Sequence, residues 1–573
     1  MQARFLLFLI FVSQILLCKG FLTPTTEREI RAVWLTTLGG LDWPHCKANN
    51  DKSILEQKQE LSSILDKLQA AHFNTIFFQT RIRSTVIYPS LIEPWDACLT
   101  GQTNKSPQYD PLAYAIEECH KRGLQLHAWV VALPGHNFKT ATNLGKYAMQ
   151  KRVPSLCTRT KDFWMLNPGV PGTADYLADI CREIVQNYDI DGIHLDYIRY
   201  PEFAARFNDG PTYKKYGGGL SLSEWRRNNV THIVETIYHT VKSIKPWVWL
   251  SCSPIGKYDN LPRQSSRGWN AYSVVFQDAQ GWLKQGIMDM LVPMMYFQAG
   301  DNFYPFALDW LESSNGRPIV NGLAAYKLDK NEGNWDISVM EKEVRFSRTI
   351  HSGGQAYFRS RHVIENQKGI YDFLKQDLYK TPSLPPAITW QNQSAPPSPR
   401  NLRFINHTNG YTLTWDSLPS TQDNPVWYNI YSCSQSATDT NNAAQLVSIR
   451  QVASTYDIHL NIPLSMLPCY AVTAINRYGI ESEATYIYPP TISPAKESYI
   501  LGDQITLYGN GILILPQSKA HSIRITDLYG QTILTSPYMK TLDLNYLPKG
   551  IYTIYGLKKK GRYNILGRYF KNK

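Results

Sequence analysis

Carboxylates, aromatic rings and basic side chains occur together at the ends of short apolar runs in this 573-residue chain. The densest group is DGIHLDYIRYP (191–201), in which Asp196, Arg199 and Tyr200 follow an apolar segment. Two carboxyl groups can cleave a glycosidic bond: one protonates the leaving oxygen, and the other attacks the anomeric carbon or activates a water. A carboxylate also stabilises the positively charged transition state. We therefore interpret Asp196 as a nucleophile or base for glycoside hydrolysis.

The sequence marks the partner carboxyl group less clearly. Glu93, in YPSLIEPW, is the first candidate for the acid because it lies in a loop after an apolar run, where functional residues concentrate. Glu202 and Asp42 are its rivals, and each of the three could instead cap a loop. Asp289 is set aside because we expect it to precede its strand, at the end away from the other candidates. The distance between the two carboxyl groups decides between retention and inversion, so both outcomes stay open.

Residues that could bind sugars follow the same runs. Aromatic rings offer flat apolar faces and, in Tyr and Trp, a polar tip. The structural alternatives are an ion pair with Glu93 for Arg81 and packing for His127 and Trp129. The substrate-binding candidates are Trp34, Asp42, Arg81, Trp95, His127, Trp129, His194, Arg199, Tyr200, Tyr296 and Tyr326.

These residues need a scaffold that brings the ends of many strands together. The chain from 27 to 382 alternates apolar runs with amphipathic stretches, as in 53–71 and 173–188. Continuous apolar runs are typical of parallel strands that are buried on both faces. The pattern predicts an α/β fold, a (β/α)8 barrel with its active site at the C-terminal ends of the strands; a doubly wound open sheet is the alternative. The eight runs are 28–37, 73–81, 124–132, 190–201, 247–254, 288–297, 318–326 and 354–360.

The chain changes character after the barrel. A proline-rich segment, 383–396, predicts a linker. Alternating strands with turns follow in 397–490, where Trp415, Tyr428 and Tyr470 resemble the pattern of a fibronectin type III domain. Residues 491–573 predict a second small β-sandwich, which resembles the C-terminal sorting domains of secreted Bacteroidetes proteins. That last domain could equally be a purely structural module.

The N-terminus predicts export. Residues 1–20 carry Arg4 and then an apolar stretch of signal-peptide length, too short for a membrane span. We expect a periplasmic, outer-membrane-associated or extracellular protein with no transmembrane span when mature; lipidation at Cys18 stays open. The net charge of +12 is dispersed along the chain, which argues against a nucleic-acid partner and suits an anionic cell envelope.

The sequence contains no recognisable motif for binding a metal or a cofactor. The nine cysteines show no CxxC spacing and no cluster with histidine, so neither a metal site nor a cofactor is predicted. A glycine-rich phosphate loop and a GxSxG segment are also missing from the sequence. Cys433 and Cys469 are the pair we would test for a disulfide in an oxidising compartment.

The order AVWLT, FQTRIRSTVIYPSLIEPW, HAW, DGIHLDYIRYP, SPIG and VPMMY resembles the glycosyl-hydrolase-like 10 family (DUF187) over about residues 28–370. The resemblance implies a (β/α)8 glycosidase whose strand-four aspartate is Asp196. Some proteins of this kind cleave peptidoglycan glycan strands that have lost their peptides. One departure is Ser84-Thr85-Val86, where the family pattern leads us to expect Gly-Asp-Ala.

We therefore predict an exported glycoside hydrolase that acts on an amino-sugar polymer, with peptidoglycan glycan as the leading substrate. A non-catalytic glycan-binding surface protein is the first alternative, because two β-domains follow the barrel. A hydrolase of dietary or host polysaccharide is the second alternative.

Overall fold

The structure is a computed structural model of the chain. Two compact units, Met1–Pro489 and Pro490–Lys573, divide it. The expected signal peptide lies outside the described residues. The description covers 28–489 and 506–571, except for 265–267, 299, 301, 392, 422–423, 434–442, 461, 463, 465–466, 509–511, 515–519, 528–529, 540, 545–546, 549 and 558–562.

Eight parallel strands form a barrel in the first unit. Their hydrogen-bonded order is β10-β11-β1-β2-β3-β7-β8-β9, and isolated bridges such as Leu291 to Ile319 join β9 to β10 and close the sheet. Each apolar run contains one strand, which confirms the (β/α)8 barrel. The bounds are β1 Ile30–Leu35, β2 Thr75–Arg81, β3 Gln125–Val131, β7 Gly192–Asp196, β8 Trp249–Cys252, β9 Met290–Leu291, β10 Val320–Leu323 and β11 Gly354–Phe358.

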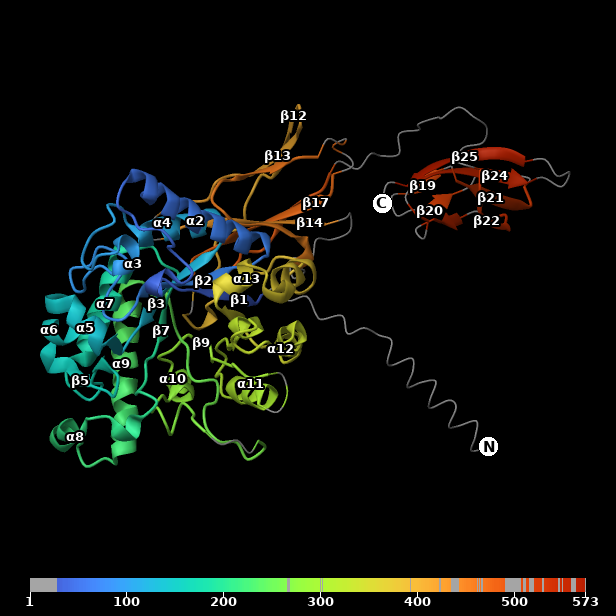
Figure 1. Cartoon of the computed structure of the whole chain (residues 1–573). Helices are drawn as coiled ribbons and strands as arrows, with labels where there is room; N and C mark the ends of the chain where they lie inside the picture. The colour runs from blue at the N-terminus through green and yellow to red at the C-terminus, as the bar shows by residue number, and fades with distance from the viewer. Residues whose placement is uncertain are drawn as a thin grey trace, which may run out of the picture. The chain divides into compact units, whose positions relative to one another are not determined.

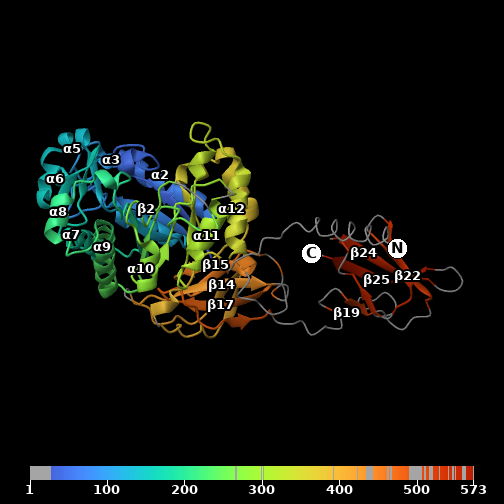
Figure 2. The ribbon, with the colours of Figure 1, turned by 90° about the horizontal axis from the view of Figure 1, so that it is seen from below.

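Helices cover the outside of this sheet (Figures 1 and 2). The longer ones are α2 Asp51–Ala70, α4 Pro111–Lys121, α7 Thr173–Asn187, α9 Leu222–Ile244, α11 Phe303–Glu312 and α12 Ile337–Thr349. The shorter helices are α3 Ala97–Thr100, α5 Phe138–Leu144, α6 Met149–Arg152, α8 Gly210–Tyr216, α10 Ala279–Gln285, α13 Ser360–Ile364 and α14 Ile370–Phe373. A small antiparallel sheet follows β3, made of β4 Pro134–Asn137, β5 Cys157–Arg159 and β6 Phe163–Leu166.

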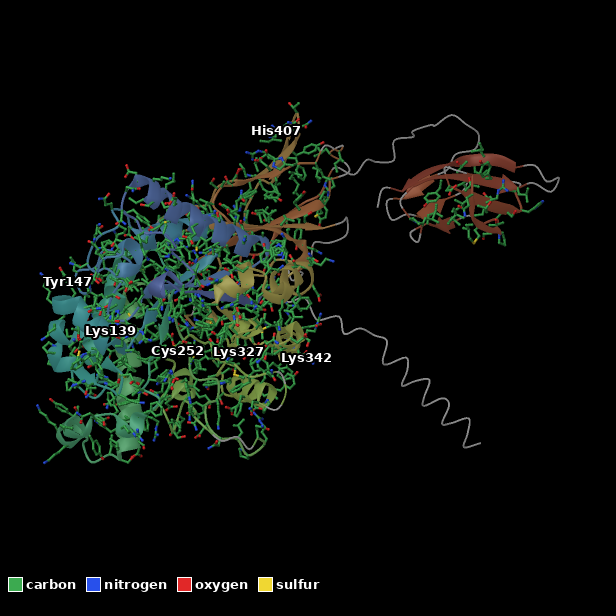
Figure 3. All side chains as sticks on the ribbon, viewed as in Figure 1. Lys139, Tyr147, Cys252, Lys327, Lys342 and His407 are labelled. Atoms are coloured by element: carbon green, nitrogen blue, oxygen red, sulfur yellow. The ribbon has the colours of Figure 1, made fainter. Side chains whose placement is uncertain are left out.

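The barrel interior is packed in layers. Side chains two residues apart on a strand point to the same face, so β3 and β7 each contribute to successive layers. A Cβ atom at residue 192 would lie 2.4 Å from His127 Nδ1, so a glycine there leaves room for the imidazole. On the outer face of the strands, Cys252 of β8 (labelled in Figure 3) belongs to the apolar cluster that the strands share with the covering helices. From the base upward, the register pairs His127 with Gly192, Trp129 with His194, and Val131 with Asp196.

The N-terminal ends of the strands form a closed base. The Glu29 carboxylate, just before β1, accepts hydrogen bonds from Arg31 at 2.7 Å and from Arg348 at 3.0 and 2.5 Å. The first part of the expected linker, residues 383–388, also packs here instead of running through solvent. Leu384 accepts a hydrogen bond from the Glu29 N–H at 3.0 Å, and Ile388 is buried. Apolar residues between the prolines explain this difference, because burial at the base removes them from water.

Within the described residues, a β-sandwich of seven strands completes the first unit. One sheet has the order β12-β13-β16, the other β15-β14-β17-β18, and their apolar faces share one core. This agrees with the all-β expectation for 397–490, while its assignment to fibronectin type III stays a prediction. The strands are β12 Arg403–His407, β13 Gly410–Thr414, β14 Trp427–Cys433, β15 Leu446–Gln451, β16 Thr455–Ile458, β17 Cys469–Ile475 and β18 Thr485–Ile487.

The second unit is also all-β. Its sheets have the orders β19-β20-β23 and β22-β21-β24-β25, which agrees with the predicted small β-domain. A role in sorting stays a prediction. The strands are β19 Thr506–Tyr508, β20 Ile512–Ile514, β21 Ser522–Thr526, β22 Thr532–Pro537, β23 Thr541–Asp543, β24 Gly550–Leu557 and β25 Tyr563–Lys571.

The structure bears on two further expectations, the absence of a transmembrane span and the disulfide between Cys433 and Cys469. Within the described residues, none of the helices has the length and apolar character needed to cross a bilayer. Cys433 and Cys469 are directly opposite each other in the antiparallel pair β14–β17. The side chain of Cys433 lies outside the described residues, so the disulfide stays a prediction.

Candidate active site

A cavity of about 690 Å³ lies at the C-terminal ends of the barrel strands, within the size range of small-ligand sites. Asp196 ends β7 and forms part of its wall. Strand β3 and the segments at and after the ends of β1, β2, β9, β10 and β11 contribute the rest of the wall, as expected for an active site of this fold.

Three donors hold the Asp196 carboxylate in place. Oδ1 accepts hydrogen bonds from the Tyr197 N–H at 2.8 Å and from the Ser253 hydroxyl at 3.0 Å. Oδ2 accepts one from the Trp129 indole N–H at 3.2 Å. Burial raises the pKa of this carboxyl, while the charge of Arg199 and the three hydrogen bonds lower it in part. The group is therefore fixed in position and suited to act as a nucleophile or base.

Arg199 acts on Asp196 at a distance. Its guanidinium lies between two rings, 4.8 Å from the Tyr197 centroid and 5.4 Å from the Trp269 centroid. Tyr197 has a φ of 51°, a left-handed conformation that is uncommon for a non-glycine residue and is found at functional sites. Arg199 itself is buried and outside the cavity wall, so its part is to position and to supply charge.

Aromatic rings form one side of the cavity. Tyr296 lies with its ring centroid 5.7 Å from Tyr326 and 6.0 Å from Phe358. Trp129 packs edge-on against Phe358 at 6.5 Å. Burial raises the pKa of Tyr296 well above its usual value, so its hydroxyl stays protonated and can donate to a sugar oxygen. The structure thus brings Trp129, Tyr296 and Tyr326 together with Asp196 as predicted.

Asp42 lies behind the wall. Its carboxylate pairs with Arg359 and accepts hydrogen bonds from the Thr36 N–H and the Ser360 hydroxyl, both at 3.0 Å. Arg359 faces the cavity in its place. Asp42 therefore positions Arg359, and the geometry does not support direct contact between Asp42 and substrate.

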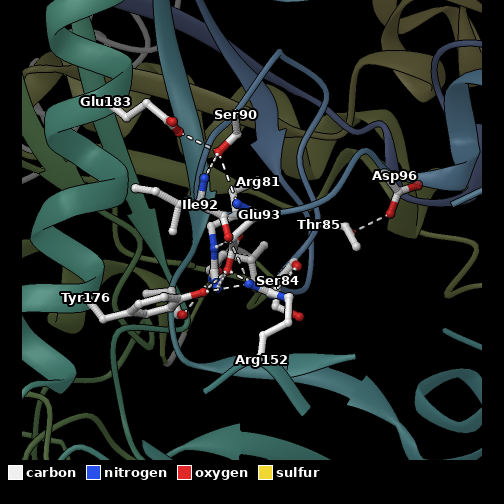
Figure 4. A network of polar contacts seen from close by, with 12 residues as sticks. Arg81, Ser84, Thr85, Ser90, Ile92, Glu93, Asp96, Arg152, Tyr176 and Glu183 are labelled. Carbon is white, nitrogen blue, oxygen red and sulfur yellow. Dashed lines mark hydrogen bonds and ion pairs between the residues drawn. The ribbon is translucent and has the colours of Figure 1, made fainter. Parts of the chain in front are cut away.

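Glu93 belongs to a buried polar network beside the cavity (Figure 4). Arg81 donates to both carboxylate oxygens, at 2.7 and 2.8 Å, and the Tyr176 hydroxyl donates at 2.7 Å. Burial alone would raise the pKa of Glu93, but Arg81 beside it holds this pKa below its ordinary value. A carboxylate that is ionised and fully engaged is a poor proton donor. Glu93 and Arg81 hold the loop after β2, and neither lines the cavity, so this geometry does not favour Glu93 as the acid or Arg81 as a substrate-binding residue.

Other predicted residues lie elsewhere. The Trp34 indole donates to His194 Nε2 at 3.0 Å, and both residues fill the layer beneath Asp196. His127 lies in the lowest layer, because β3 continues beyond it to Val131. Burial lowers the pKa of His127 to about 4. Tyr200 packs edge-on against Phe207 and Phe276 in the core. Trp95 is half-buried against the main core cluster, and Glu202 is exposed; neither forms part of the cavity wall.

Sequence reasoning missed three carboxylates of the cavity wall, Asp329, Glu332 and Glu365. The Asn331 N–H donates to Asp329 at 2.8 Å, and Arg361 donates to Glu365 at 2.9 Å. Within the described part of the chain, the Glu332 side chain has neither a hydrogen bond nor an ion pair. Asp329 and Glu332 could have been found in the sequence, because both lie in the segment LDKNEG (328–333), which follows the seventh apolar run.

The family departure at Ser84-Thr85-Val86 has a local explanation. Ser84 has a φ of 64°, the left-handed region that favours the glycine of the family pattern. The Thr85 hydroxyl donates to Asp96 at 2.6 Å. Asp96 also accepts the Cys98 N–H at 2.7 Å and so caps α3. This segment therefore shapes the loop around Glu93.

Comparison with known proteins gives the family. The model of the family described as glycosyl hydrolase-like 10 matches residues 29–335. The chain belongs to the glycosyl hydrolase-like 10 family. It is a glycoside hydrolase, and its substrate is a glycan.

Two relatives of this glycosyl hydrolase-like 10 protein are named glycosyl hydrolases. It is 32% identical to glycosyl hydrolase YngK of Bacillus subtilis (strain 168) over 450 residues, 75% of this chain and 87% of that protein. It is 33% identical to glycosyl hydrolase DigH of Escherichia coli (strain K12), over 55% of this chain and 78% of that protein. A solved structure, the glycoside hydrolase domain of PgaB (BpsB) from Bordetella bronchiseptica, aligns with a TM-score of 0.43 and 13% identity, over 62% of this chain and 99% of that chain.

Proposed function

We propose that this glycoside hydrolase is exported and cleaves an amino-sugar polymer, with peptidoglycan glycan strands as its substrate. Export rests on the signal-like residues 1–20, and places the enzyme in the periplasm, at the outer membrane or outside the cell. The choice of polymer rests on the family resemblance of DGIHLDYIRYP and its neighbours. The single observation that carries the reaction is the buried Asp196 carboxylate in the cavity wall.

Asp196 acts in this proposal as the nucleophile or base. Its Oδ1 is occupied by two donors and Oδ2 by one, which leaves Oδ2 the freer oxygen to face the anomeric carbon or a water. The aromatic side of the cavity stacks on the sugar ring, and the Tyr296 hydroxyl orients it. The negative charge of the buried Asp196 carboxylate stabilises the oxocarbenium-like transition state.

Glu332 is the acid partner that we infer for Asp196. Asp329 and Glu365 are engaged with neighbours, whereas the Glu332 carboxyl is available to give a proton. The Glu332 side chain is exposed. A bound glycan would exclude water from this part of the cavity wall, the setting in which a positioned carboxyl group can pass its proton to the leaving oxygen.

The Asp196→Asn variant tests the proposal. We expect turnover of glycan strands freed of peptides to fall about 10³-fold, since an amide can neither attack nor take up a proton. Because folding raises the pKa of Asp196, ionisation at neutral pH opposes folding, and the amide should leave the Tm unchanged or higher. Reducing-end release and thermal unfolding measure the two effects.

Three outcomes separate the alternatives. A wild-type protein that binds amino-sugar strands, releases no ends and binds equally well as Asp196→Asn would be a glycan-binding protein. Turnover confined to dietary or host polysaccharides in a substrate panel would replace the proposed polymer. Full turnover in Asp196→Asn would contradict the role of Asp196.

A further inference from the structure

A second cavity of about 570 Å³ adjoins the one that holds Asp196. The two share Leu38 and Arg83 in their walls. Residues of α3 form one side of the second cavity, and β4 with α5 forms the other. Two adjoining cavities of this size suit consecutive sugars of one polymer.

Arg83 differs from the arginines around it. Arg81 is paired with Glu93, Arg359 with Asp42, and Arg361 with Glu365. Arg83 is half-buried and, within the part of the chain that the structure describes, takes part in neither an ion pair nor a hydrogen bond. A guanidinium in this setting keeps its donors and charge for a ligand, and its planar fork matches a carboxylate.

The position of Arg83 is also central. Burial raises the pKa of Tyr197 in the first cavity and lowers that of His136 in the second, and the charge of Arg83 lowers both. Its guanidinium is therefore within electrostatic reach of groups in both cavities. A ligand that crosses from one cavity to the other would pass this charge.

The other polar groups of the second cavity suit an uncharged sugar face beside that carboxylate. His136 Nδ1 is buried with no partner among the described residues, and burial lowers its pKa, so the neutral ring can bond to a hydroxyl or an amide. Lys47 donates to the Cys98 carbonyl at 2.7 Å. The Asp96 carboxylate, which also lines the cavity, already accepts from Thr85 and the Cys98 N–H.

We propose that the second cavity is a sugar subsite and that Arg83 binds a carboxylate carried by the polymer. The substrate is then an acidic amino-sugar polymer, such as strands with N-acetylmuramic acid whose lactyl carboxylate is free. A peptide joined to that carboxylate turns it into an amide, which removes the charge that Arg83 binds. This inference rests on the proposed function and narrows its substrate.

The experiment compares two substrates and three proteins. Peptide-free glycan strands are used as isolated, or with their carboxylates converted to neutral methylamides. The wild type should turn over the carboxylate form with a kcat/KM about tenfold or more above that of the methylamide, in line with a hydrogen bond between charged groups. Arg83→Gln should lose this preference, and Arg83→Lys should keep part of it. Arg182→Gln, at an exposed arginine of α7, is the matched control.

Binding gives a second readout that does not depend on turnover. In the Asp196→Asn background, the carboxylate strands should bind about tenfold more tightly than the methylamide strands, and Arg83→Gln should abolish the difference. A preference that survives Arg83→Gln, or its absence in the wild type, would overturn the inference while leaving the proposed function in place. Release of no ends by the wild type from either substrate would instead refute the proposed function.

Discussion

Asp196 has to be ionised to attack or to take up a proton, yet its position at the end of β7 favours the protonated form. Burial raises its pKa, and Arg199, Ser253, the Tyr197 N–H and Trp129 oppose that rise. These neighbours therefore set the lower end of the pH range in which the enzyme is active. Because Asp196 acts in its ionised form, activity should fall as the pH drops through its raised pKa.

Ser253→Ala should move that acidic limit to higher pH. The Ser253 hydroxyl donates to Asp196 Oδ1 at 3.0 Å and stabilises the ionised form, so its loss raises the pKa further. Near neutral pH the loss of kcat/KM should be small, and it should grow as the pH falls. A pH profile of kcat/KM for both proteins measures this shift; profiles that coincide on the acidic side would mean that another group controls the limit.

Glu332→Gln should slow cleavage of glycan strands by about 10²- to 10⁴-fold, since general acid catalysis contributes on this scale. Substrates with an activated aryl leaving group need no protonation, so the variant should cleave them at a rate near that of the wild type. Glu202→Gln and Glu365→Gln are made in parallel. If either of these is rescued by the activated leaving group and Glu332→Gln is not, the acid has been assigned to the wrong residue.

The sequence predicted the residues of the site unevenly. Asp196, Trp129, Tyr296 and Tyr326 all lie in the cavity wall, because each stands near the C-terminal end of a strand. His127 was placed too high, since the run 124–132 does not show which of its residues ends the strand. Glu332 and Arg83 were missed because loop residues follow no period, and their approach to the cavity depends on the fold of the loop.

At the scale of elements, the eight strands followed from the apolar runs alone. Both faces of these strands are buried, so the hydrophobic signal is continuous and strong. The start of α4 carries a local sequence signal, Asp110 followed by Pro111, and the Asp110 side chain accepts hydrogen bonds from the Leu112 and Ala113 N–H groups at 3.0 Å. Helix α11 was missed because its sequence, FYPFALDWLE, contains a proline and is apolar on most positions.

Glu93→Gln tests the loop after β2 as a structural element. The variant leaves the buried Arg81 guanidinium without its charged partner, which should lower the free energy of unfolding by about 3–5 kcal/mol. The surviving folded enzyme should keep most of its kcat. Thermal unfolding and kcat at a temperature below both transitions measure the two effects.

Glu341→Gln is the matched control for that prediction. Glu341 pairs with Arg345 on α12 at 2.8 Å, and both side chains are partly exposed, so its loss should change stability by less than about 1 kcal/mol. A stable Glu93→Gln protein that has lost turnover would restore Glu93 as a catalytic candidate.

At the scale of the whole molecule, the β-sandwich of the first unit contacts the base of the barrel. Arg450 of β15 lies 3.0 Å from the Asp191 carboxylate, Arg477 lies 2.6 Å from Asp189, and Arg28 lies 2.5 Å from Glu481. Asp191 precedes β7, whereas Asp196 ends it, so this contact and the cavity lie at opposite ends of one strand. From its composition, the proline-rich segment 383–396 was expected to be a spacer. Its packing at the base could not be predicted, because it depends on contacts between residues far apart in the sequence.

Arg450→Ala should weaken this contact without changing the chemistry. Burial alone would raise the pKa of Asp191, but Arg450 and His120 hold it well below its usual value. The pairing therefore stabilises the fold above the ordinary pKa of an aspartate, about 4, and the stabilisation is lost as the pH falls below that value. We expect a lower Tm at pH 7, a smaller Tm difference from the wild type at acidic pH, and an unchanged kcat/KM on glycan strands.

Arg403→Ala, at an exposed arginine of β12, is the control and should change neither the Tm nor kcat/KM. A Tm difference that does not shrink with acid would show that Arg450 acts through its packing on Trp427, 4.2 Å from the ring centroid, and not through Asp191.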